Sequence, residues 1–345
     1  MPDGLKGLDV ARASAWLTAN IPALQAPFDV SLVAAGGSNL TYKVVDASGR
    51  AVVLRRPPLR GQLATAHDMA REWRILHALG SFPSGVPVPA CLAACEDPEV
   101  LGAGFYVMEF VDGLILRDSA SARSLSAAQA RAATESLVDV QIAMHRLDLD
   151  AAGLADLGRH SGYVARQLAR WKKQVDAGQT RALPLLADLH RRLAARIPTE
   201  QGRPGLVHGD YRFDNVVLGA DCALVAVLDW ELCTIGEPVA DFVWSLCYWA
   251  DPGDALHFLP DPPTCGAQFM RRDAVAELYA ARSGFDLSDI DYYTAFSWWK
   301  MACIVEGVYG RMLRGAGGGM KTGPLEQVAT MVERYLAQAD DLLGE

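Results

Sequence analysis

The side chains best suited to chemistry lie in one short part of the 345-residue chain. Asp210 follows a short apolar strand that ends at Val207, Asn215 lies five positions after Asp210, and Asp229 ends a second apolar run at 224–228. Phosphoryl transfer needs a carboxylate that orients the attacking hydroxyl and hard oxygen ligands that hold Mg²⁺ against nucleotide phosphates. Two carboxylates and one amide at this spacing therefore indicate phosphoryl transfer as the chemistry of the segment.

A β-hairpin is expected to bring these side chains together. The strand 216–218, a turn at 219–221 and the strand 224–228 follow Asn215 in order. Because antiparallel strands joined by a short turn lie side by side, Asn215 at the start of the hairpin is expected beside Asp229 at its end. Isolated Asp residues are more often turn or cap residues. Three suitable side chains at the right spacing and in the right strand context make that alternative the weaker interpretation.

The same residues carry a resemblance to a known family. Asp210 and Asn215 have the Asp-x-x-x-x-Asn spacing of the protein-kinase catalytic loop, and Asp229 stands where the magnesium-binding Asp of Asp-Phe-Gly stands. The run His-Gly-Asp-x-x-x-x-Asn followed by Val-Leu-Asp-Trp-Glu resembles the aminoglycoside phosphotransferase/choline kinase family. The runs 227–236 and 105–109 are similar to the kinase-like domains related to those fused to some acyl-CoA dehydrogenases, and the resemblance covers about residues 36–310.

The resemblance implies a role for each residue of the segment. It makes Asp210 the catalytic base, Asn215 and Asp229 the ligands of Mg²⁺, and ATP the phosphate donor. It gives His208 a scaffold role in the catalytic loop, whereas the chemistry of imidazole also allows a general base. Gly209 stands where regulated protein kinases carry Arg, and no Ala-Pro-Glu segment follows Asp229, so the sequence disfavours a protein kinase.

A glycine-containing turn is the candidate phosphate-binding loop. Gly36, Gly37, Ser38 and Asn39 separate the first two β-rich runs, so their backbone N–H groups and the two polar side chains are candidate donors to nucleotide phosphates. Such turns are common in hairpins, and this one alone is a weak signal. No Gly-Lys-Ser/Thr follows, so it is not a Walker A loop.

Arg55 stands on the third strand, where kinases place a phosphate-binding lysine. Glu72, on the helix that follows, is its expected partner, and a guanidinium keeps the charge and binds phosphate in a bidentate manner. Arg56 takes this role if the register shifts by one residue, and a solvated charge at the strand end is the alternative for Arg55. Backbone groups at Glu109 and Val111, in the expected hinge, are the candidate adenine contacts.

The elements around these motifs predict an α+β, bilobal, protein-kinase-like fold. Beta-rich runs at 28–35, 40–45, 51–55, 88–95 and 104–110, with a helix at 66–79, predict an N-terminal five-stranded antiparallel sheet with one helix. Helical patterns dominate from residue 126 onward, interrupted by the short β-rich part 206–229. We expect a nucleotide-binding lobe at 1–110 and a larger, mainly helical lobe at 111–345 that binds the acceptor and performs catalysis.

The acceptor is expected to be the hydroxyl of a small molecule bound by the helical lobe. Aromatic residues at 242–249 and 292–299 either line its pocket or fill the helical core, and the core is the default interpretation. The resemblance suggests a hydroxyacyl-CoA-type acceptor and a functional link to an acyl-CoA dehydrogenase. Two alternatives stay open: an aminoglycoside phosphotransferase, and an inactive nucleotide-binding module, which Arg55 in place of lysine motivates.

Two further acidic residues accompany the segment. Asp241 lies twelve residues after Asp229 and is expected to cap or brace the catalytic loop. Glu231 is a candidate neighbour of a second magnesium ion, which the sequence alone does not decide.

Composition excludes several classes of protein. The formal net charge is −9 and no block of like charges stands out, so nucleic-acid binding through phosphate neutralisation is not expected. The seven cysteines form no Cys-x-x-Cys pair and are expected to be reduced thiols. We find no secretory signal pattern and no apolar run long enough to span a membrane. The expected location is the cytoplasm, with no membrane partner.

Overall fold

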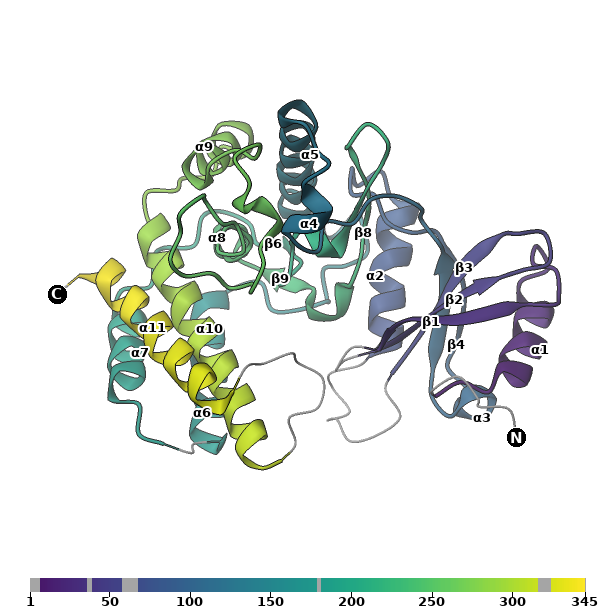
Figure 1. The fold of residues 1–345 in the computed structure, drawn as a ribbon, viewed down its shortest axis with the longest axis horizontal. Coiled ribbons are helices and arrows are strands. Elements are labelled where there is room, and N and C mark those ends of the chain that lie inside the picture. Colours follow the sequence, from purple (N-terminus) through teal and green to yellow (C-terminus); the bar gives the residue numbers. More distant parts are fainter. Residues whose placement is uncertain (1–6, 36–38, 58–67, 179–180, 316–323, 345) are drawn as a thin grey trace. The chain divides into compact units, whose positions relative to one another are not determined.

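The computed structural model describes residues 7–35, 39–57, 68–178, 181–315 and 324–344 (Figure 1). The chain divides into two compact units, of which the first comprises 1–113 and 225–231 and the second comprises 114–224 and 232–345. The sequence places its single boundary after residue 110. The structure adds the return segment 225–231 to the first unit, where Val227 N–H donates to Pro87 O at 2.8 Å and Asp229 forms an ion pair with Arg55.

The first unit is built on the predicted five-stranded antiparallel sheet. Its strands are β1 (Asp29–Ala35), β2 (Leu40–Val45), β3 (Ala51–Arg56), β4 (Cys91–Cys95) and β5 (Phe105–Glu109). Their order is β1-β2-β3-β5-β4, and every neighbouring pair is antiparallel. The strand order differs from the chain order only at β4 and β5, because α2 (Met69–Ser81) and a connecting segment separate β3 from β4.

The two faces of this sheet have different tasks, as the period of two in a strand allows. One face packs Tyr42, Leu54 and Val107 against α1 (Val10–Asn20), whose Leu17 is fully buried. The opposite face carries Arg55, in register with Tyr106 on β5. Helices α1 and α2 lie on opposite sides of the sheet in Figure 1. The hydrophobic core therefore lies on the α1 side, which leaves the α2 side for polar groups.

Helix α2 begins where its sequence provides a cap. Asp68 precedes it, and the Asp68 side chain accepts a hydrogen bond from Arg71 N–H at 2.9 Å, which satisfies one of the free donors of the first turn. Glu72 follows in the first turn and is buried together with Ile75 and Leu76. The cap and the apolar residues thus fix the turn of α2 that presents Glu72.

The second unit is mainly helical. Its longer helices are α5 (Ala127–His145), α6 (Tyr163–Gly178), α7 (Pro184–Ala195), α8 (Pro238–Leu246), α9 (Arg272–Ser283), α10 (Ile290–Leu313) and α11 (Leu325–Leu343), with the short helix α4 (Ser119–Ala122) before them; the one-turn helix α3 (Pro98–Leu101) belongs to the first unit. Short strands interrupt the helices: β6 (Gly205–Val207) pairs with β9 (Thr234–Gly236) in antiparallel fashion, and β7 (Val216–Leu218) forms a two-stranded sheet with β8 (Leu224–Val227).

Strand β6 and helix α8 form the support of the second unit's polar residues. All three β6 residues are buried, and nearly all of α8 is buried as well, Asp241 included. A carboxylate in such a place must be hydrogen-bonded to be tolerated. Its partners are therefore expected to be structurally important.

The structure bears on two expectations from composition, which concern membrane-spanning helices and disulfide bonds. Within the described ranges, no helix combines the length and apolar character that a bilayer span needs. All seven cysteines lie in the described part of the chain and none is in a disulfide.

A buried acid at the start of α8 makes stability depend on pH. Burial raises the pKa of Glu237 to about 7, and the Glu200 carboxylate acts in the same direction. Because the folded-state pKa lies above that of an unfolded Glu, the stability it contributes is present below about pH 4.5 and is lost as pH rises through 7. Glu237→Gln, which mimics the neutral form, should match the wild type at pH 5 and exceed its stability by on the order of 2 kcal/mol at pH 8.

The comparison is made by thermal and urea unfolding of both proteins between pH 5 and pH 8. Glu326→Gln, at an exposed position in the first turn of α11, is the matched control and should show no such divergence. If Glu237→Gln and the wild type keep a constant difference across this range, Glu237 is not protonated in the folded protein near neutral pH.

Candidate active site

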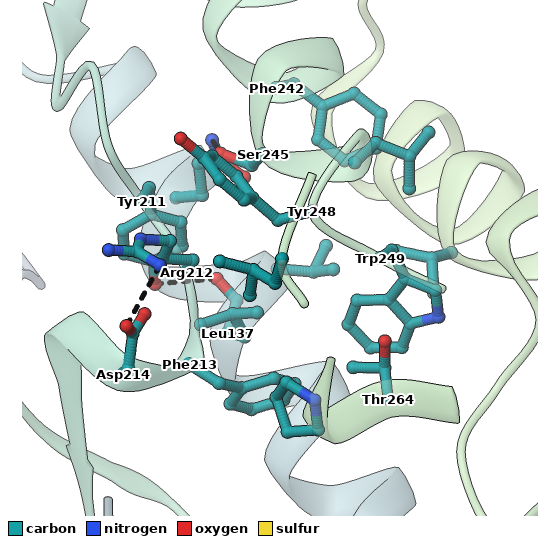
Figure 2. Close-up of a pocket in the computed structure, with 16 residues that line it drawn as sticks. Leu137, Tyr211, Arg212, Phe213, Asp214, Phe242, Ser245, Tyr248, Trp249 and Thr264 are labelled. Atoms are coloured by element: carbon teal, nitrogen blue, oxygen red, sulfur yellow. Dashed lines mark hydrogen bonds and ion pairs between the residues drawn. The ribbon is translucent and has the colours of Figure 1, made fainter. Parts of the chain in front are cut away.

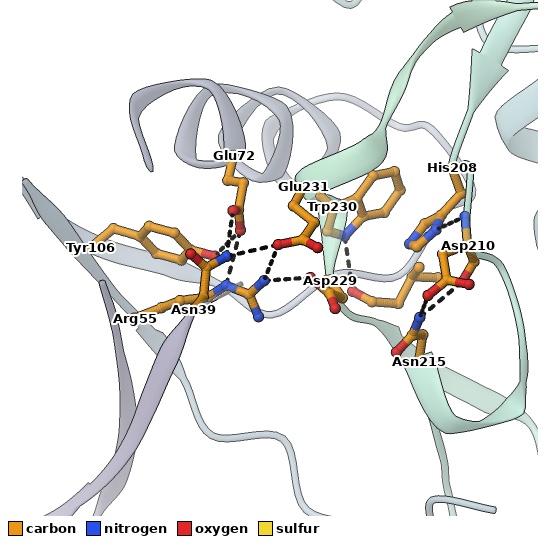
Figure 3. Close-up of polar contacts among 11 residues, drawn as sticks. Asn39, Arg55, Glu72, Tyr106, His208, Asp210, Asn215, Asp229, Trp230 and Glu231 are labelled. Carbon is orange, nitrogen blue, oxygen red and sulfur yellow. Dashed lines mark hydrogen bonds and ion pairs between the residues drawn. The ribbon is translucent and has the colours of Figure 1, made fainter. Parts of the chain in front are cut away.

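The Arg55 guanidinium is the centre of a buried polar cluster in the first unit (Figure 3). Its side chain is only 11% exposed, and its Nε lies 3.0 Å from Glu72 Oε2. Its Nη2 binds Asp229 Oδ1 and lies 3.9 Å from Glu231 Oε2. One cation is therefore shared among three carboxylates that reach it from α2 and from the return segment after β8.

Neutral donors complete the cluster. Tyr106 O–H donates to Glu72 Oε2 at 3.0 Å, and Asn39 Nδ2 donates to Glu72 Oε1 and Glu231 Oε2, each at 3.1 Å. Burial raises the pKa of Glu72, while the Arg55 guanidinium acts to lower it. For Arg55 itself burial acts to lower the pKa, but the surrounding acidic groups hold it above its ordinary value. The pair is thus stabilised by mutual contact and by hydrogen bonds, as burial of charges requires.

The strand register separates Arg55 from Arg56. Because successive side chains of a strand point to opposite faces, only one of the two reaches Glu72. Arg56 Nη1 donates instead to the backbone oxygen of Gly7 on the other face of the sheet. The residue that pairs with Glu72 is therefore Arg55, and it is not the solvated strand-end charge that the sequence left as an alternative.

Asp229 has an unusual backbone. Its φ is +61°, in the left-handed region that costs a residue with a side chain on the order of 1 kcal/mol or more. The turn is held by Trp230, whose indole N–H donates to Val227 O at 3.0 Å. The turn directs the Asp229 carboxylate to Arg55 while 34% of that side chain stays exposed.

The charges around Arg55 favour a further cation. Glu72, Asp229 and Glu231 bring three carboxylates to one guanidinium, so the cluster has an excess of negative charge when all are ionised. Mg²⁺ binds to hard oxygen donors, commonly one or two protein groups together with substrate phosphates. The partly exposed carboxylate of Asp229 thus fits the predicted role of magnesium ligand.

In the second unit, Asp241 holds the backbone of the loop that carries Asp210. Asp241 Oδ1 accepts a hydrogen bond from Gly209 N–H at 2.9 Å, and Oδ2 accepts one from His208 N–H at 3.2 Å. His145 Nε2 lies 3.2 Å from the same Oδ2. Burial acts to raise the pKa of Asp241, but the bonds from His145 and Gly209 hold it below its ordinary value. The predicted brace is confirmed, and it is an ionised carboxylate.

Gly209 is a glycine for two structural reasons. Its φ is +82°, and a Cβ at this position would lie 3.1 Å from both Cβ and O of Leu232. A side chain there is opposed by the backbone conformation and by the space available. His208 next to it is fully buried, and its Nδ1 accepts from Asp210 N–H at 3.3 Å. A ring so enclosed fits the scaffold role better than that of a base.

Asn215 orients the Asp210 carboxylate. Its side-chain Nδ2 donates to Asp210 O at 2.8 Å and to Asp210 Oδ2 at 3.0 Å (Figure 3). With the amide nitrogen engaged in this way, the amide oxygen is directed away from Asp210, which suits a ligand of Mg²⁺. The side chain of Asp210 is 22% exposed, so a small substrate has access to it.

Arg212 is the contact that sequence reasoning missed. Its Nε lies 3.1 Å from Asp210 Oδ1, and its Nη1 lies 2.9 Å from Asp214 Oδ2 (Figure 2). The guanidinium also lies over the ring of Tyr248, 5.1 Å from its centroid. The alternation of charges at 210, 212 and 214 was the available signal, but the sequence did not say that one basic side chain would bind both acids.

The acceptor side of the second unit is closely packed. A cavity of about 30 Å³ is lined by residues of the loop 211–214, of α5 and α8 and of the segment after α8 (Figure 2). Trp244, Trp249 and Trp298 are at most 9% exposed and Trp299 is fully buried. These aromatic residues therefore fill the core, as the default interpretation held, and Trp249 also lines the small cavity.

The remaining predicted nucleotide contacts are only partly described. Gly36, Gly37 and Ser38 lie outside the described residues. Asn39 is described, and its amide bonds to Glu72 and Glu231. Glu109 ends β5 with an exposed side chain, and Val111 N–H has no hydrogen-bond partner among the residues that the structure describes. A hinge backbone with such a donor is suited to a base edge.

Loss of Arg55 should leave a buried charge without a partner. We expect Arg55→Met to lower the free energy of unfolding by about 3–5 kcal/mol, because the Glu72 carboxylate stays buried. Adding Glu72→Gln should recover part of this loss, since it removes that charge. Urea unfolding of the two single variants and the double variant gives the coupling between the sites. Arg50→Met, at an exposed position, is the control, and an equal effect in both would contradict the pair.

Asp241 should determine how tightly the loop is held. Asp241→Asn keeps the size of the side chain but replaces an oxygen by a donor, so one of the two backbone N–H groups at 208 and 209 loses its acceptor. We expect a loss of about 2 kcal/mol in stability and faster hydrogen exchange at His208 and Gly209. Asp139→Asn, an exposed ion-pair residue on α5, should change neither. Unchanged exchange at these two amides in Asp241→Asn would show that the loop is held by other contacts.

Known proteins share this architecture. Residues 29–285 match the phosphotransferase enzyme family. A solved structure from Ralstonia eutropha, provisionally assigned as an aminoglycoside phosphotransferase, superimposes with a TM-score of 0.80 at 29% identity over 97% of this chain and 98% of that one. The GDP complex of aminoglycoside 2'-phosphotransferase-IIIa has a TM-score of 0.64 at 16% identity, over 96% of this chain and 100% of that one, which shows the fold alone.

Curated relatives are longer proteins. Mouse acyl-CoA dehydrogenase family member 10 is 35% identical over 81% of this chain and 26% of its own length. Human acyl-CoA dehydrogenase family member 11 is 33% identical over 84% of this chain and 37% of its own length. The chain thus spans about a quarter to two fifths of the relatives it matches. The predicted kinase-like α+β fold is confirmed, and the chain belongs to the phosphotransferase enzyme family.

Proposed function

We propose that this protein transfers the γ-phosphate of ATP to the hydroxyl of a small molecule in a magnesium-dependent reaction. The observation that carries the proposal is the Asp210 carboxylate, which is partly exposed and held between Asn215 Nδ2 and Arg212 Nε. Its loop is fixed from behind by Asp241. A carboxylate that is both accessible and fixed in direction is what the alignment of an attacking hydroxyl requires.

Each residue of the second unit then has a distinct task. Asp210 would accept a hydrogen bond from the acceptor hydroxyl and take its proton as the new O–P bond forms. The bond between the γ-phosphorus and the β,γ-bridging oxygen breaks in the same step, and ADP leaves. Asn215 holds Asp210 through its amide nitrogen and directs its amide oxygen to the metal. Arg212 holds the Asp210 carboxylate through an ion pair, and Asp214 keeps Arg212 in place.

The first unit supplies the nucleotide side. Asn215 and Asp229 would hold Mg²⁺, which when bound neutralises negative charge on the phosphates. Arg55, fixed by Glu72, would contact phosphate oxygens through its guanidinium. Backbone N–H groups of Gly36, Gly37 and Ser38 would close over the phosphates, and the Glu109 and Val111 backbone would bind the adenine edge. Nucleotides bound to structural neighbours, GDP in one and ADP in another, support a nucleotide site.

We further propose a hydroxylated acyl-CoA-type metabolite as acceptor. The curated relatives are named acyl-CoA dehydrogenase family members, which supports acyl chemistry and a functional link to such a dehydrogenase. The buried cation Lys300 in the second unit would oppose the binding of a polycationic aminoglycoside beside it. We place the reaction in the cytoplasm.

Asp210 is the residue to test. Asp210→Asn should lower kcat for ADP formation by at least about 100-fold, because the proton acceptor is lost while the shape is kept. Binding of ATP with Mg²⁺, measured by titration calorimetry, should stay within a few-fold of the wild type. Asp176→Asn, at an exposed ion pair on α6, is the matched control and should be fully active.

The assay uses a panel of hydroxyacyl-CoAs, free hydroxy acids and aminoglycosides with a coupled ADP readout. Undiminished turnover by Asp210→Asn would show that another group is the base. Nucleotide binding without turnover on any acceptor would favour the inactive module. Turnover confined to aminoglycosides would replace the acyl acceptor by an antibiotic.

A further inference from the structure

Lys300 on α10 is a buried cation whose environment lacks an anion. Lys300 is 8% exposed, and its Nζ lies 3.6 Å from the centroid of the Trp244 ring on α8. Among the described residues no carboxylate forms an ion pair with this ammonium, and its close contact is the Trp244 ring. An indole face stabilises a buried ammonium only in part, because the three N–H donors still need acceptors.

Trp244 has the same deficiency. It is 4% exposed, and its indole N–H is buried without a hydrogen-bond partner among the described residues. Unsatisfied buried donors are rare in folded proteins and ask for an explanation. Because this N–H belongs to the ring that contacts the Lys300 ammonium, an oxygen atom that carries negative charge is the partner that suits both groups.

Short contacts link this pair to Asp210. The Trp244 ring meets the Tyr248 ring at 5.7 Å, and the Arg212 guanidinium that binds Asp210 lies over that same Tyr248 ring. Burial raises the pKa of Tyr248 well above its ordinary value, and the Asp210 carboxylate acts in the same direction. Lys300 and Trp244 thus lie one side chain beyond the residue proposed to receive the acceptor hydroxyl.

The pKa of Lys300 agrees with the lack of a direct anionic partner. Burial lowers the pKa of Lys300 to about 8, although Asp241 and Asp210 act at longer range to raise it. Arg170 also acts to lower it. The distant carboxylates do not replace a direct partner, because each is engaged elsewhere: Asp241 with the loop backbone and Asp210 with Asn215 and Arg212.

A ring that contacts Trp244 also lines a groove. Phe258 contacts the Trp244 ring at 5.4 Å and the Trp298 ring at 4.6 Å. The same Phe258 lines a groove of about 560 Å³ whose other walls include Leu259, Met331 and Tyr335.

We propose that Lys300 and the Trp244 indole N–H bind a carboxylate or carbonyl oxygen of the acceptor and thereby select acyl compounds over cations. This inference rests on the proposed function for the identity of the ligand as an acceptor. The pair determines specificity and takes no part in proton transfer. Its donors fix one end of the acceptor, and Asp210 receives the hydroxyl at another position along it.

A matched series of probes tests the inference without nucleotide. The ω-hydroxy acids of three to six carbons, the diols and amino alcohols of the same lengths, and the hydroxyacyl thioesters of N-acetylcysteamine differ only in the group opposite the hydroxyl. Titration calorimetry with the wild type should give affinities at least 10-fold higher for the acids or thioesters than for the amino alcohols. Comparison of acids with thioesters distinguishes a carboxylate from a carbonyl.

The variants distinguish hydrogen bonding by the two donors from packing of their side chains. Lys300→Met should lower affinity for the favoured probes at least 10-fold and leave the amino alcohols unchanged or improved. Lys300→Arg should retain part of the preference, and Trp244→Phe, which keeps an aromatic ring but lacks the N–H, should lose several-fold. Lys173→Met, at an exposed position on α6, is the matched control and should bind as the wild type does.

Several outcomes overturn the inference. The inference is wrong if the wild type binds amino alcohols as tightly as acids, or if it binds none of the probes. It is also wrong if both Lys300→Met and Trp244→Phe keep the preference for acids or thioesters. The proposed function fails separately: selective binding that depends on Lys300, without ADP formation from any bound hydroxy compound, leaves the site and removes the transferase. If Lys300→Met forms ADP as fast as the wild type with the same acceptors, the transferase stands and the proposed binding site at Lys300 is wrong.

Discussion

The shared guanidinium of Arg55 is the interaction on which the first unit's polar architecture depends. It lies between a carboxylate of α2 and two carboxylates of the segment that returns after β8. Only a forked side chain can present Nε to Glu72 and Nη2 to Asp229 at the same time, whereas a lysine offers a single point charge. The replacement of lysine by arginine therefore does not indicate a lost function; it lets one residue fix both α2 and the Asp229 turn.

In the second unit a buried anion, and not a cation, holds the polar residues in place. There a buried carboxylate, Asp241, collects donors from the loop backbone and from His145, so that the loop is fixed through main-chain atoms and its side chains stay available. Because Gly209 has a positive φ and no room for a Cβ, the backbone can approach Asp241 in only one way. The direction of Asp210 is thus set by contacts that never touch a substrate.

Local patterns in the sequence predicted much of this, and long-range directions did not follow from them. Strand alternation and turn residues located the five strands. The hydrogen bond from Asn215 to Asp210 was not predicted, because the hairpin argument placed Asn215 beside Asp229. The pairing of Arg212 with two acids depends on rotamers that spacing does not determine. The return of 225–231 to the first unit depends on contacts with β3 and Pro87, which are distant in sequence. The positive φ of Asp229 was equally beyond pattern reasoning, because only a few per cent of residues other than glycine adopt one.

The charges of the two units agree with the proposal of a donor site and an acceptor site that differ in character. Around Arg55 the carboxylates exceed the cations, which favours a divalent metal and hence a nucleotide bound as its metal complex. At Lys300 and Trp244 the donors exceed the acceptors, which favours an oxygen with negative charge. Each uncompensated charge is largely buried and therefore lowers the stability of the ligand-free protein. Binding of a ligand with the opposite charge would remove this cost. A surplus of this kind selects a ligand by its charge before any contact of shape is made.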